Sequence, residues 1–198
     1  MRALVLLLAL AFTATAVSAQ APSRTQKLFL NVQVDGARLY FDEDNFERND
    51  PGGGAALRAG YGVSRVVTLF GGLSGARIDG ETNGVIDDTY DWGVLEVGAR
   101  FNFGGGRRAL VPYLETSLQG AEATYDPSDL RFRGAALGVG AGLQYFVTEG
   151  LALDGALRGA VGGFNEIQLG RLTVAVNEDD FGFAATRLSF GLTWYPTR

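Results

Sequence analysis

Apolar and polar side chains alternate along most of this chain, and clusters of Gly, Asp and Asn interrupt the alternation. A period of two residues is typical of β-strands whose two faces meet different surroundings. Helical periodicity is almost absent after residue 19. We therefore predict an all-β chain with eight antiparallel strands. These strands are expected at residues 27–41, 54–63, 66–78, 90–103, 110–124, 134–147, 151–164 and 183–195.

The predicted connections alternate in length, with three short turns and four longer, more polar loops. Short turns at one end and long loops at the other are typical of closed up-and-down barrels in outer membranes. An even number of strands would return both termini to the short-turn side. Near Asp35 and Gly36 the alternation slips, which predicts a β-bulge. The short connections are residues 63–65, 104–109 and 148–150, and the long ones are residues 41–53, 79–89, 125–133 and 165–180.

The beginning of the chain predicts its compartment. Residues 1–19 place a positive charge, a short apolar run and small residues in the order of a cleaved secretory signal, with cleavage after Ala19 or, alternatively, Ala21. A retained anchor helix is the less favoured alternative, because the apolar run is shorter than the ~20 residues that a membrane helix needs. We expect residues 20–198 to form one barrel domain, since no linker or domain break follows.

The composition of the polar face favours a membrane barrel over a soluble one. This face is rich in Gly with a few charges of both signs, and Lys27 is the single Lys after residue 19. The lumen of an eight-stranded barrel is only just wide enough for its side chains, and a buried charge there needs a partner. A soluble lipocalin-like binder, with its apolar face inward, is the alternative. The predicted lumen charge network consists of Arg58, Glu96, Arg100, Glu115, Asp154, Arg158 and Arg187.

Aromatic residues gather near the predicted strand ends. Such a distribution predicts two aromatic girdles at the membrane interfaces. The ordinary preference of aromatic residues for strands is the alternative explanation. The set comprises Tyr40, Phe41, Tyr61, Tyr90, Trp92, Phe101, Phe103, Tyr113, Tyr145, Phe146, Trp194 and Tyr195.

Several stretches in order resemble the small outer-membrane β-barrel proteins with an OmpA-like or OmpX-like barrel. They are residues 52–63 with 65–72, 95–103, 112–120, 134–146 and 189–196. The resemblance implies a transmembrane barrel in the cell outer membrane, contact with outer-membrane lipid and lipopolysaccharide, and insertion by the barrel assembly machinery. In this family that machinery reads the closing strand, here Gly191, Leu192, Trp194 and Tyr195, although this chain continues for three residues beyond the aromatic pair.

The residue inventory argues against catalysis and cofactors. The chain has no His and no Cys, which excludes Ser–His–acid triads, thiol nucleophiles and thiolate metal sites. Carboxylate-only catalysis by Glu96 with Glu115 or Asp154 is the alternative to salt bridges among these groups. We predict a protein that is not an enzyme, with no catalytic residue and no cofactor.

Two further ligand classes are disfavoured. Acidic groups at residues 42–50, 79–91 and 178–180 offer oxygen ligands for Ca²⁺ or Mg²⁺, but none has EF-hand spacing. We expect solvated loops there and no metal site. The formal net charge is −5 and basic clusters are lacking, so nucleic acid is not an expected partner.

Members of the resembling family differ in function, so the fold alone does not decide it. Paired lumen charges favour a closed barrel that anchors in the membrane and presents long loops as a structural or interaction protein. The alternative is a narrow channel or facilitator for ions or small apolar molecules, for which the Gly-lined second and sixth strands leave room.

Overall fold

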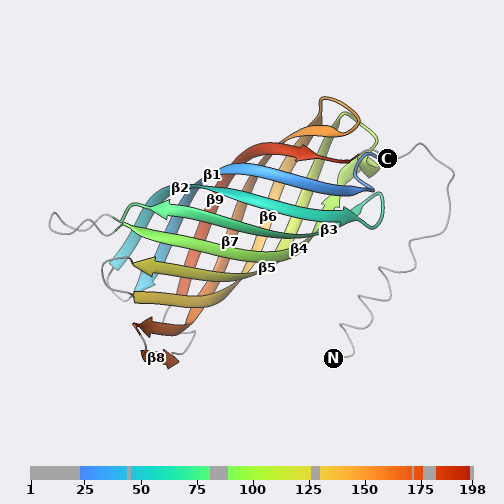
Figure 1. The fold of residues 1–198 in the computed structure, drawn as a ribbon. Helices are drawn as coiled ribbons and strands as arrows, with labels where there is room; N and C mark the ends of the chain where they lie inside the picture. Colours follow the sequence, from blue (N-terminus) through green and yellow to red (C-terminus); the bar gives the residue numbers. More distant parts are fainter. Residues whose placement is uncertain are drawn as a thin grey trace, which may run out of the picture.

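The computed structural model is a closed antiparallel β-barrel (Figure 1). It describes residues 23–43, 46–80, 89–125, 130–170, 172–175 and 182–196. The predicted signal at residues 1–19 therefore lies outside the described residues. The strands are β1 (Leu28–Glu43), β2 (Phe46–Gly62), β3 (Val67–Ile78), β4 (Tyr90–Asn102), β5 (Leu110–Tyr125), β6 (Leu130–Phe146), β7 (Leu151–Leu169), β8 (Leu172–Ala175) and β9 (Gly182–Trp194).

Eight of these strands form the barrel wall, which confirms the predicted fold. Each of β1 to β7 pairs with its neighbour in the chain, and β9 pairs with both β7 and β1 and so closes the sheet. The short strand β8 pairs with β7 alone among the described strands, at Glu166–Leu169. No helix in the described part of the chain is long and apolar enough to cross a membrane.

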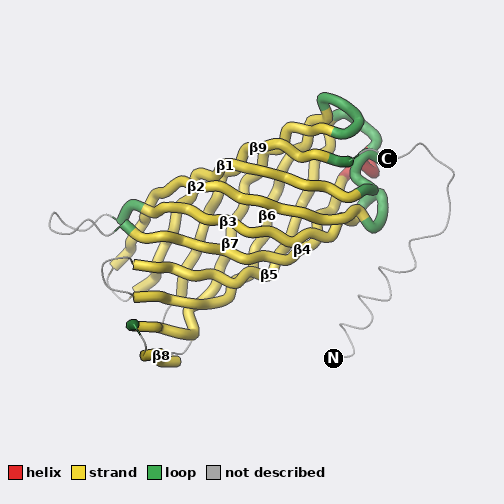
Figure 2. Tube along the Cα trace, viewed as in Figure 1, coloured by secondary structure: helices red, strands yellow, loops and turns green. Residues whose placement is uncertain are grey.

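The short connections lie together at one end of the barrel, with the end of β9 (Figure 2). They follow Gly62, Asn102 and Phe146, as the sequence predicts. The connection after β4 is a 3-10 helix, η2 (Phe103–Gly106), in which three consecutive glycines have φ between 63° and 73°. Only Gly adopts this left-handed backbone without strain, so the glycine cluster makes a tight turn.

At the opposite end the strands are longer than the alternation predicts. β1 and β2 remain paired out to Glu43 and Phe46, so the predicted loop at residues 41–53 is mostly strand. β7 likewise continues to Leu169 and turns back as β8. Backbone pairing does not require an apolar face, and alternation disappears where both faces are polar. Many of the acidic residues of the predicted long loops lie outside the described residues, at 44–45, 81–88, 126–129 and 176–181.

The predicted bulge in the first strand is wrong. β1 pairs with β2 without a register shift from Leu28 to Glu43. The pattern changes near Gly36 because the surroundings change: Ala37 and Leu39 point into an interior that is apolar at this height. The register shift lies instead between Arg133 and Gly134 of β6, opposite β7.

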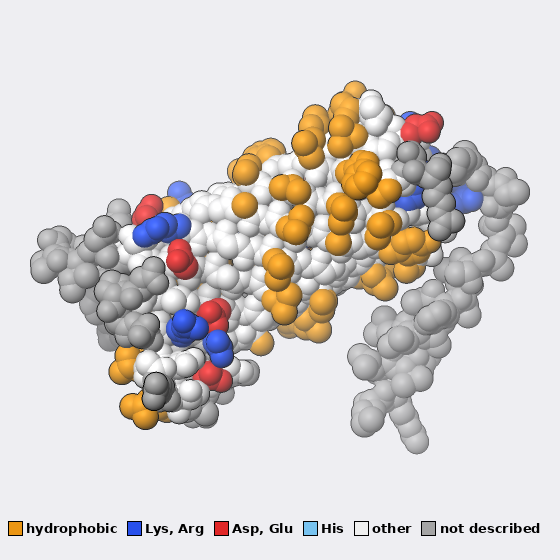
Figure 3. All heavy atoms as spheres, viewed as in Figure 1, with side chains coloured by type: hydrophobic (Ala, Val, Ile, Leu, Met, Phe, Trp, Pro, Cys, Tyr) orange, Lys and Arg blue, Asp and Glu red, His pale blue; other side chains and the backbone are white. Residues whose placement is uncertain are grey.

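The apolar face points outward, which confirms the face assignment made for a membrane barrel. Val34, Leu118 and Val139 expose 65%, 62% and 66% of their surface. Figure 3 shows such side chains spread over the half of the wall nearer the short turns, with charged side chains at both ends of the barrel. Along β5 the outward positions change from Leu118 to Gly120 and then Glu122, which marks where the apolar band ends.

Candidate functional site: a lumen filled in three layers

Inward-facing side chains change character along the barrel axis in three steps. On β1, Phe29 is followed by Asn31, Gln33 and Asp35, and then by Ala37. We name the three levels, in order from the short-turn end, the aromatic layer, the ion-pair layer and the apolar layer. The aromatic layer consists of Phe29, Phe70, Val111, Phe146, Ala152 and Tyr195.

Glu115 on β5 lies at the centre of the ion-pair layer. Its Oε1 accepts hydrogen bonds from Arg58 Nη1 at 2.8 Å and Arg158 Nε at 2.6 Å. Its Oε2 accepts from Arg100 Nη2 at 3.1 Å and Nε at 3.2 Å. One carboxylate of β5 therefore joins arginines of β2 and β7 across the lumen, and an arginine of the neighbouring strand β4.

Two further carboxylates extend the network. Glu96 Oε1 lies 2.5 Å from Arg58 Nη2, and its Oε2 lies 3.8 Å from Arg187 Nη2. Arg187 also donates from Nη1 to Ser74 Oγ at 2.6 Å, which connects β9 to β3 across the interior. The side chains of Glu96 and Arg187 are 1% and 7% exposed, so solvent does little to screen these charges.

Asp154 on β7 links the charges to neutral polar groups. Tyr113 Oη donates to its Oδ1 at 2.7 Å, and Gln33 Nε2 donates to the same atom at 3.1 Å. Gln144 Nε2 donates to Oδ2 at 2.8 Å, and Arg100 Nη1 lies 3.5 Å from that oxygen. The structure thus brings all seven residues of the predicted charge network together in one layer.

The sequence analysis missed one charge in this region. Asp35 of β1 is only 7% exposed and follows Gln33 on the same inward face. With Asp35 the layer holds four arginines and four carboxylates, so its formal charge is zero. The alternation that identified Arg58 also identifies Asp35, whereas the roles of Tyr113 and Gln144 depend on register between distant strands.

Arginines of the ion-pair layer also pack on aromatic rings. The Arg100 guanidinium lies 4.0 Å from the ring centre of Tyr113 and 5.6 Å from that of Phe29. Arg58 lies 5.0 Å from the ring centre of Phe70. Desolvated cation–π contacts stabilise such pairs by about 2 kcal/mol. Through the contacts with Phe29 and Phe70, the ion-pair layer packs directly on the aromatic layer.

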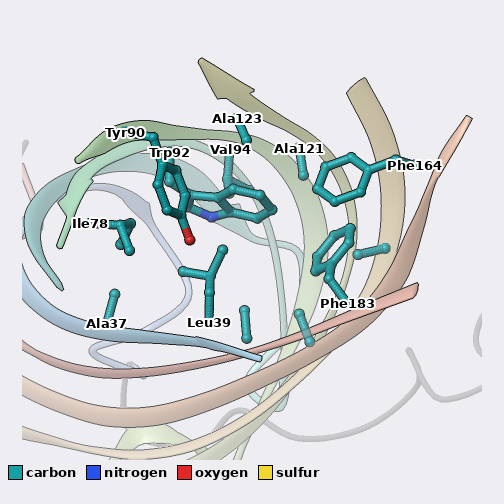
Figure 4. Packing of buried hydrophobic residues seen from close by; sticks show 13 residues of the cluster. Ala37, Leu39, Ile78, Tyr90, Trp92, Val94, Ala121, Ala123, Phe164 and Phe183 are labelled. Carbon is teal, nitrogen blue, oxygen red and sulfur yellow. The ribbon is translucent and has the colours of Figure 1, made fainter. Parts of the chain in front are cut away.

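Beyond the ion pairs the interior is mostly apolar (Figure 4), with the buried Asp50 accepting a hydrogen bond from Tyr90 Oη at 3.1 Å. Trp92 and Phe183 meet edge to face with ring centres 5.1 Å apart, and Phe164 lies 4.9 Å from Phe183. The apolar layer consists of Ala37, Leu39, Ile78, Tyr90, Trp92, Val94, Ala121, Ala123, Ala136, Ala160, Phe164, Phe183 and Ala185.

The prediction of two aromatic girdles is therefore partly wrong. Aromatic side chains near strand ends point both ways, because the barrel interior accepts rings as readily as the lipid interface does. Those that point outward near the short turns are Tyr61, Phe101, Phe103, Tyr145 and Trp194, and Tyr40 points outward at the far end. Those that point inward are Tyr90, Trp92, Tyr113, Phe146 and Tyr195.

The segment before β1 covers the short-turn end of the lumen. Thr25 is fully buried and Ser23 is 5% exposed. Arg24 donates its backbone N–H to Gly106 O at 2.9 Å, and its guanidinium lies 5.5 Å from the ring centre of Phe146. The first described residues therefore pack between η2 and the aromatic layer.

The residues of the predicted assembly signal lie on both faces of the closing strand. Leu192 and Trp194 point outward and are half exposed, whereas Tyr195 points inward and donates from Oη to Gln144 Oε1 at 2.9 Å. Gly191 faces the lumen beside β1, where a Cβ would lie 2.7 Å from Gln33 Cγ. The outward series of β9 therefore ends on Trp194.

The described residues bring no three Asp or Glu side chains together in a way that could hold a metal ion. The three carboxylates considered for catalysis, Glu96, Glu115 and Asp154, are each engaged by arginine. These three carboxylates are therefore bound to cationic side chains and not grouped as an acid–base pair.

Comparisons with known proteins agree with this architecture. The model of the outer membrane protein beta-barrel domain matches residues 4–195. No curated protein sequence matches the chain. The fold is similar to Neisserial surface protein A, at 20% identity over 84% of this chain and 97% of that chain with a TM-score of 0.57.

Two other solved structures share the fold. The outer membrane protein AlkL in lipid bilayers is 14% identical over 92% of this chain and 96% of that chain, with a TM-score of 0.54. OprG from Pseudomonas aeruginosa is 11% identical over 89% of this chain and 100% of that chain, with a TM-score of 0.53. With its closed barrel, outward apolar band and matching family model, the chain belongs to the outer membrane β-barrel proteins and resides in the cell outer membrane.

Proposed function

We propose that this protein is a closed barrel that anchors in the outer membrane and acts as a structural or interaction protein through the parts that extend outside. The observation that supports a closed lumen is the ion-pair layer, in which Glu115 alone joins Arg58, Arg100 and Arg158. These side chains come from β2, β4, β5 and β7 and meet inside the lumen. An open pore at this height would have to separate them.

Separating the layer would be costly. Removing one partner of a buried ion pair destabilises a protein by about 3–5 kcal/mol, because the remaining charge is left without compensation. Several such pairs share the carboxylates here. We expect the folded barrel to stay closed at this level on the time scale of solute passage.

Single-channel conductance of the refolded protein in a planar bilayer tests the proposal. We expect no discrete current steps from the wild-type barrel, with the gel shift between unboiled and boiled samples as the folding control. Discrete, reproducible steps from folded wild-type protein would overturn it. The variant Glu96→Ala/Arg187→Ala removes an inward ion pair at constant charge, and Glu122→Ala/Arg133→Ala does the same on the outer wall. Current from the first variant alone would identify the ion-pair layer as the seal.

The apolar layer favours one alternative, a facilitator for small apolar molecules. Its walls combine alanines with the rings of Trp92, Phe164 and Phe183. Trp92 and Trp194 are the two tryptophans of the chain, so Trp194→Phe leaves a single fluorophore in this layer. Saturable quenching of Trp92 by a brominated alkane would favour the facilitator, and quenching no greater than membrane partitioning predicts would favour the closed barrel.

We also propose that the protein has no enzymatic activity, supported by the engagement of Glu96, Glu115 and Asp154 by arginine. The expected partners are outer-membrane lipid and lipopolysaccharide along the apolar band, and the barrel assembly machinery at the closing strand. Replacing Trp194 with Ala should lower the amount of inserted barrel in cells more than Tyr40→Ala, another outward aromatic residue. Equal insertion of the two variants would argue against a role of Trp194 in assembly.

A further inference from the structure

Three consecutive inward side chains of β1 each have a buried oxygen without a hydrogen-bond partner. These atoms are Asn31 Oδ1, Gln33 Oε1 and Asp35 Oδ1. Across the pairing of β1 and β9, Ser189 faces Asp35, and its Oγ is also unpartnered and fully buried. Buried polar atoms in folded proteins almost always have a partner, so a row of four at one side of the lumen requires an explanation.

The orientation of the two amides follows from their bonds. Asn31 Nδ2 donates to Leu192 O at 3.3 Å and to Thr193 Oγ1 at 2.8 Å, and a carbonyl oxygen accepts but cannot donate. Gln33 Nε2 donates to the Asp154 carboxylate at 3.1 Å, which likewise accepts. Both amide nitrogens are thus used, and both amide oxygens have no partner among the described residues. The three oxygens of β1 are hydrogen-bond acceptors and require donors, whereas the Ser189 hydroxyl can donate one hydrogen bond and accept others.

Geometry and charge limit what that donor is. Inward residues two apart on a strand are separated by about 6.6 Å, whereas a bound cation needs its oxygen ligands within about 2.3–2.6 Å of the ion. Water molecules with hydrogen bonds of about 2.8 Å bridge oxygens that are 5–6 Å apart. The ion-pair layer is already neutral, so an added cation would leave it with an unbalanced charge.

We propose that the lumen face of β1 binds a file of internal water molecules, which runs from Asn31 past Gln33 to Asp35 beside the ion pairs. The inward residues next to Gln33 on the neighbouring strands are Ala56 and Gly191, which place no long side chain over this part of the row. Each water in the file donates to one of the row's oxygens, and neighbouring waters bond to one another. Two to four polar partners are typical of buried water.

Both ends of the file are closed. On the short-turn side of Asn31, the inward residue is Phe29, which is fully buried. On the other side of Asp35, the inward residues are Ala37 and Leu39 of the apolar layer. The waters are therefore enclosed and exchange slowly with solvent.

Water–protein cross-relaxation in the NMR spectrum of the refolded barrel tests the proposal. We expect cross-peaks between the water signal and the side-chain amide protons of Asn31 and Gln33, of the sign given by long-lived water. The indole N–H of Trp92, inside the apolar layer, is the internal reference and should show none. Absence of the Asn31 and Gln33 cross-peaks in folded wild-type protein would overturn the proposal.

Two matched variants and a salt titration sharpen the result. Gln33→Met keeps the side-chain length without the oxygen and should remove the Asn31 cross-peak. Gln144→Met alters an amide whose Nε2 and Oε1 are both bonded, and should leave it. Loss in both variants, or in neither, would contradict the file. Shifts of the Asn31 and Gln33 resonances in NaCl but not in choline chloride would identify a bound cation and overturn the assignment to water. Conductance is a separate readout, so its outcome does not decide this one.

Discussion

Glu115 occupies the position where a single substitution affects the largest number of buried charges. Its two oxygens bind Arg58, Arg100 and Arg158, and its side chain is 4% exposed. Glu115→Ala would leave three buried guanidinium groups without their shared partner. We expect a loss of at least about 3–5 kcal/mol in the free energy of unfolding, because the loss of one partner of a buried pair already has that effect.

Denaturant titration of the refolded barrel, followed by tryptophan fluorescence and the gel shift, measures this change. Glu122→Ala is the matched control, because Glu122 also pairs with an arginine, Arg133, at 2.6 Å, but on the outer wall with 38% of its side chain exposed. Exposed pairs contribute little to stability, so the control midpoint should stay close to that of the wild type. Equal midpoints for the two variants would argue against a tightly coupled ion-pair layer.

At the scale of elements, η2 and the segment before β1 depend on each other. Gly106 has a φ of 63°, and a Cβ built on it would collide with Thr25 Oγ1 and lie 2.6 Å from Ser23 Oγ. Gly106→Ala should therefore displace residues 23–25 from the short-turn end of the lumen. Trypsin cleavage after Arg24, measured by mass spectrometry on the refolded barrel, should become faster than in the wild type.

Gly104→Ala separates this effect from backbone strain. Gly104 has a φ of 73°, but nothing lies within 4 Å of its built Cβ. Both variants place Ala in a left-handed conformation, and only Gly106→Ala adds the collision with the segment. Similar cleavage rates for the two variants would show that strain in the turn, and not contact with Ser23 and Thr25, controls this segment.

The elements also show where sequence reasoning succeeds. All eight barrel strands were predicted because lipid and lumen impose opposite polarity on alternate residues throughout the apolar band. Outside the band that contrast ends, and the outer parts of β1, β2, β6 and β7 were assigned to loops although backbone pairing continues there. The change near Gly36 was read as a bulge because polarity, and not pairing, changes at that height.

The candidate site was predicted in its charges but not in its connections. Arg58 and Glu115 are recognisable as inward residues from alternation alone. Their contact joins β2 to β5 across the lumen, and it depends on the register of every strand between them. Alternation in phase with Glu96 and Arg187 also indicates the inward direction of Trp92 and Tyr195, but the girdle prediction rested on position near strand ends and did not use this phase.

At the scale of the whole molecule, the apolar band and the extension of β6, β7 and β8 predict how the barrel sits in the membrane. Leu114 of β5 lies on the outward face within the band and is 49% exposed. Leu169 of β7 is exposed to a similar extent, 54%, but lies beyond Arg133 and Glu166, where the wall is charged. Two leucines of similar exposure should therefore differ in surroundings, one facing lipid and the other water.

Substitution by arginine distinguishes these surroundings. Arg on the lipid face near the bilayer midplane costs about 2–4 kcal/mol, and the cost falls to about 0–1 kcal/mol near the interfaces. We expect Leu114→Arg to lower the free energy of unfolding in lipid vesicles by the larger amount, and Leu169→Arg to leave it nearly unchanged. Equal losses would mean that the membrane reaches the β7–β8 extension. Little loss from either variant would mean that the apolar band around Leu114 does not face hydrocarbon, and the membrane orientation drawn from the outward side chains would have to be abandoned.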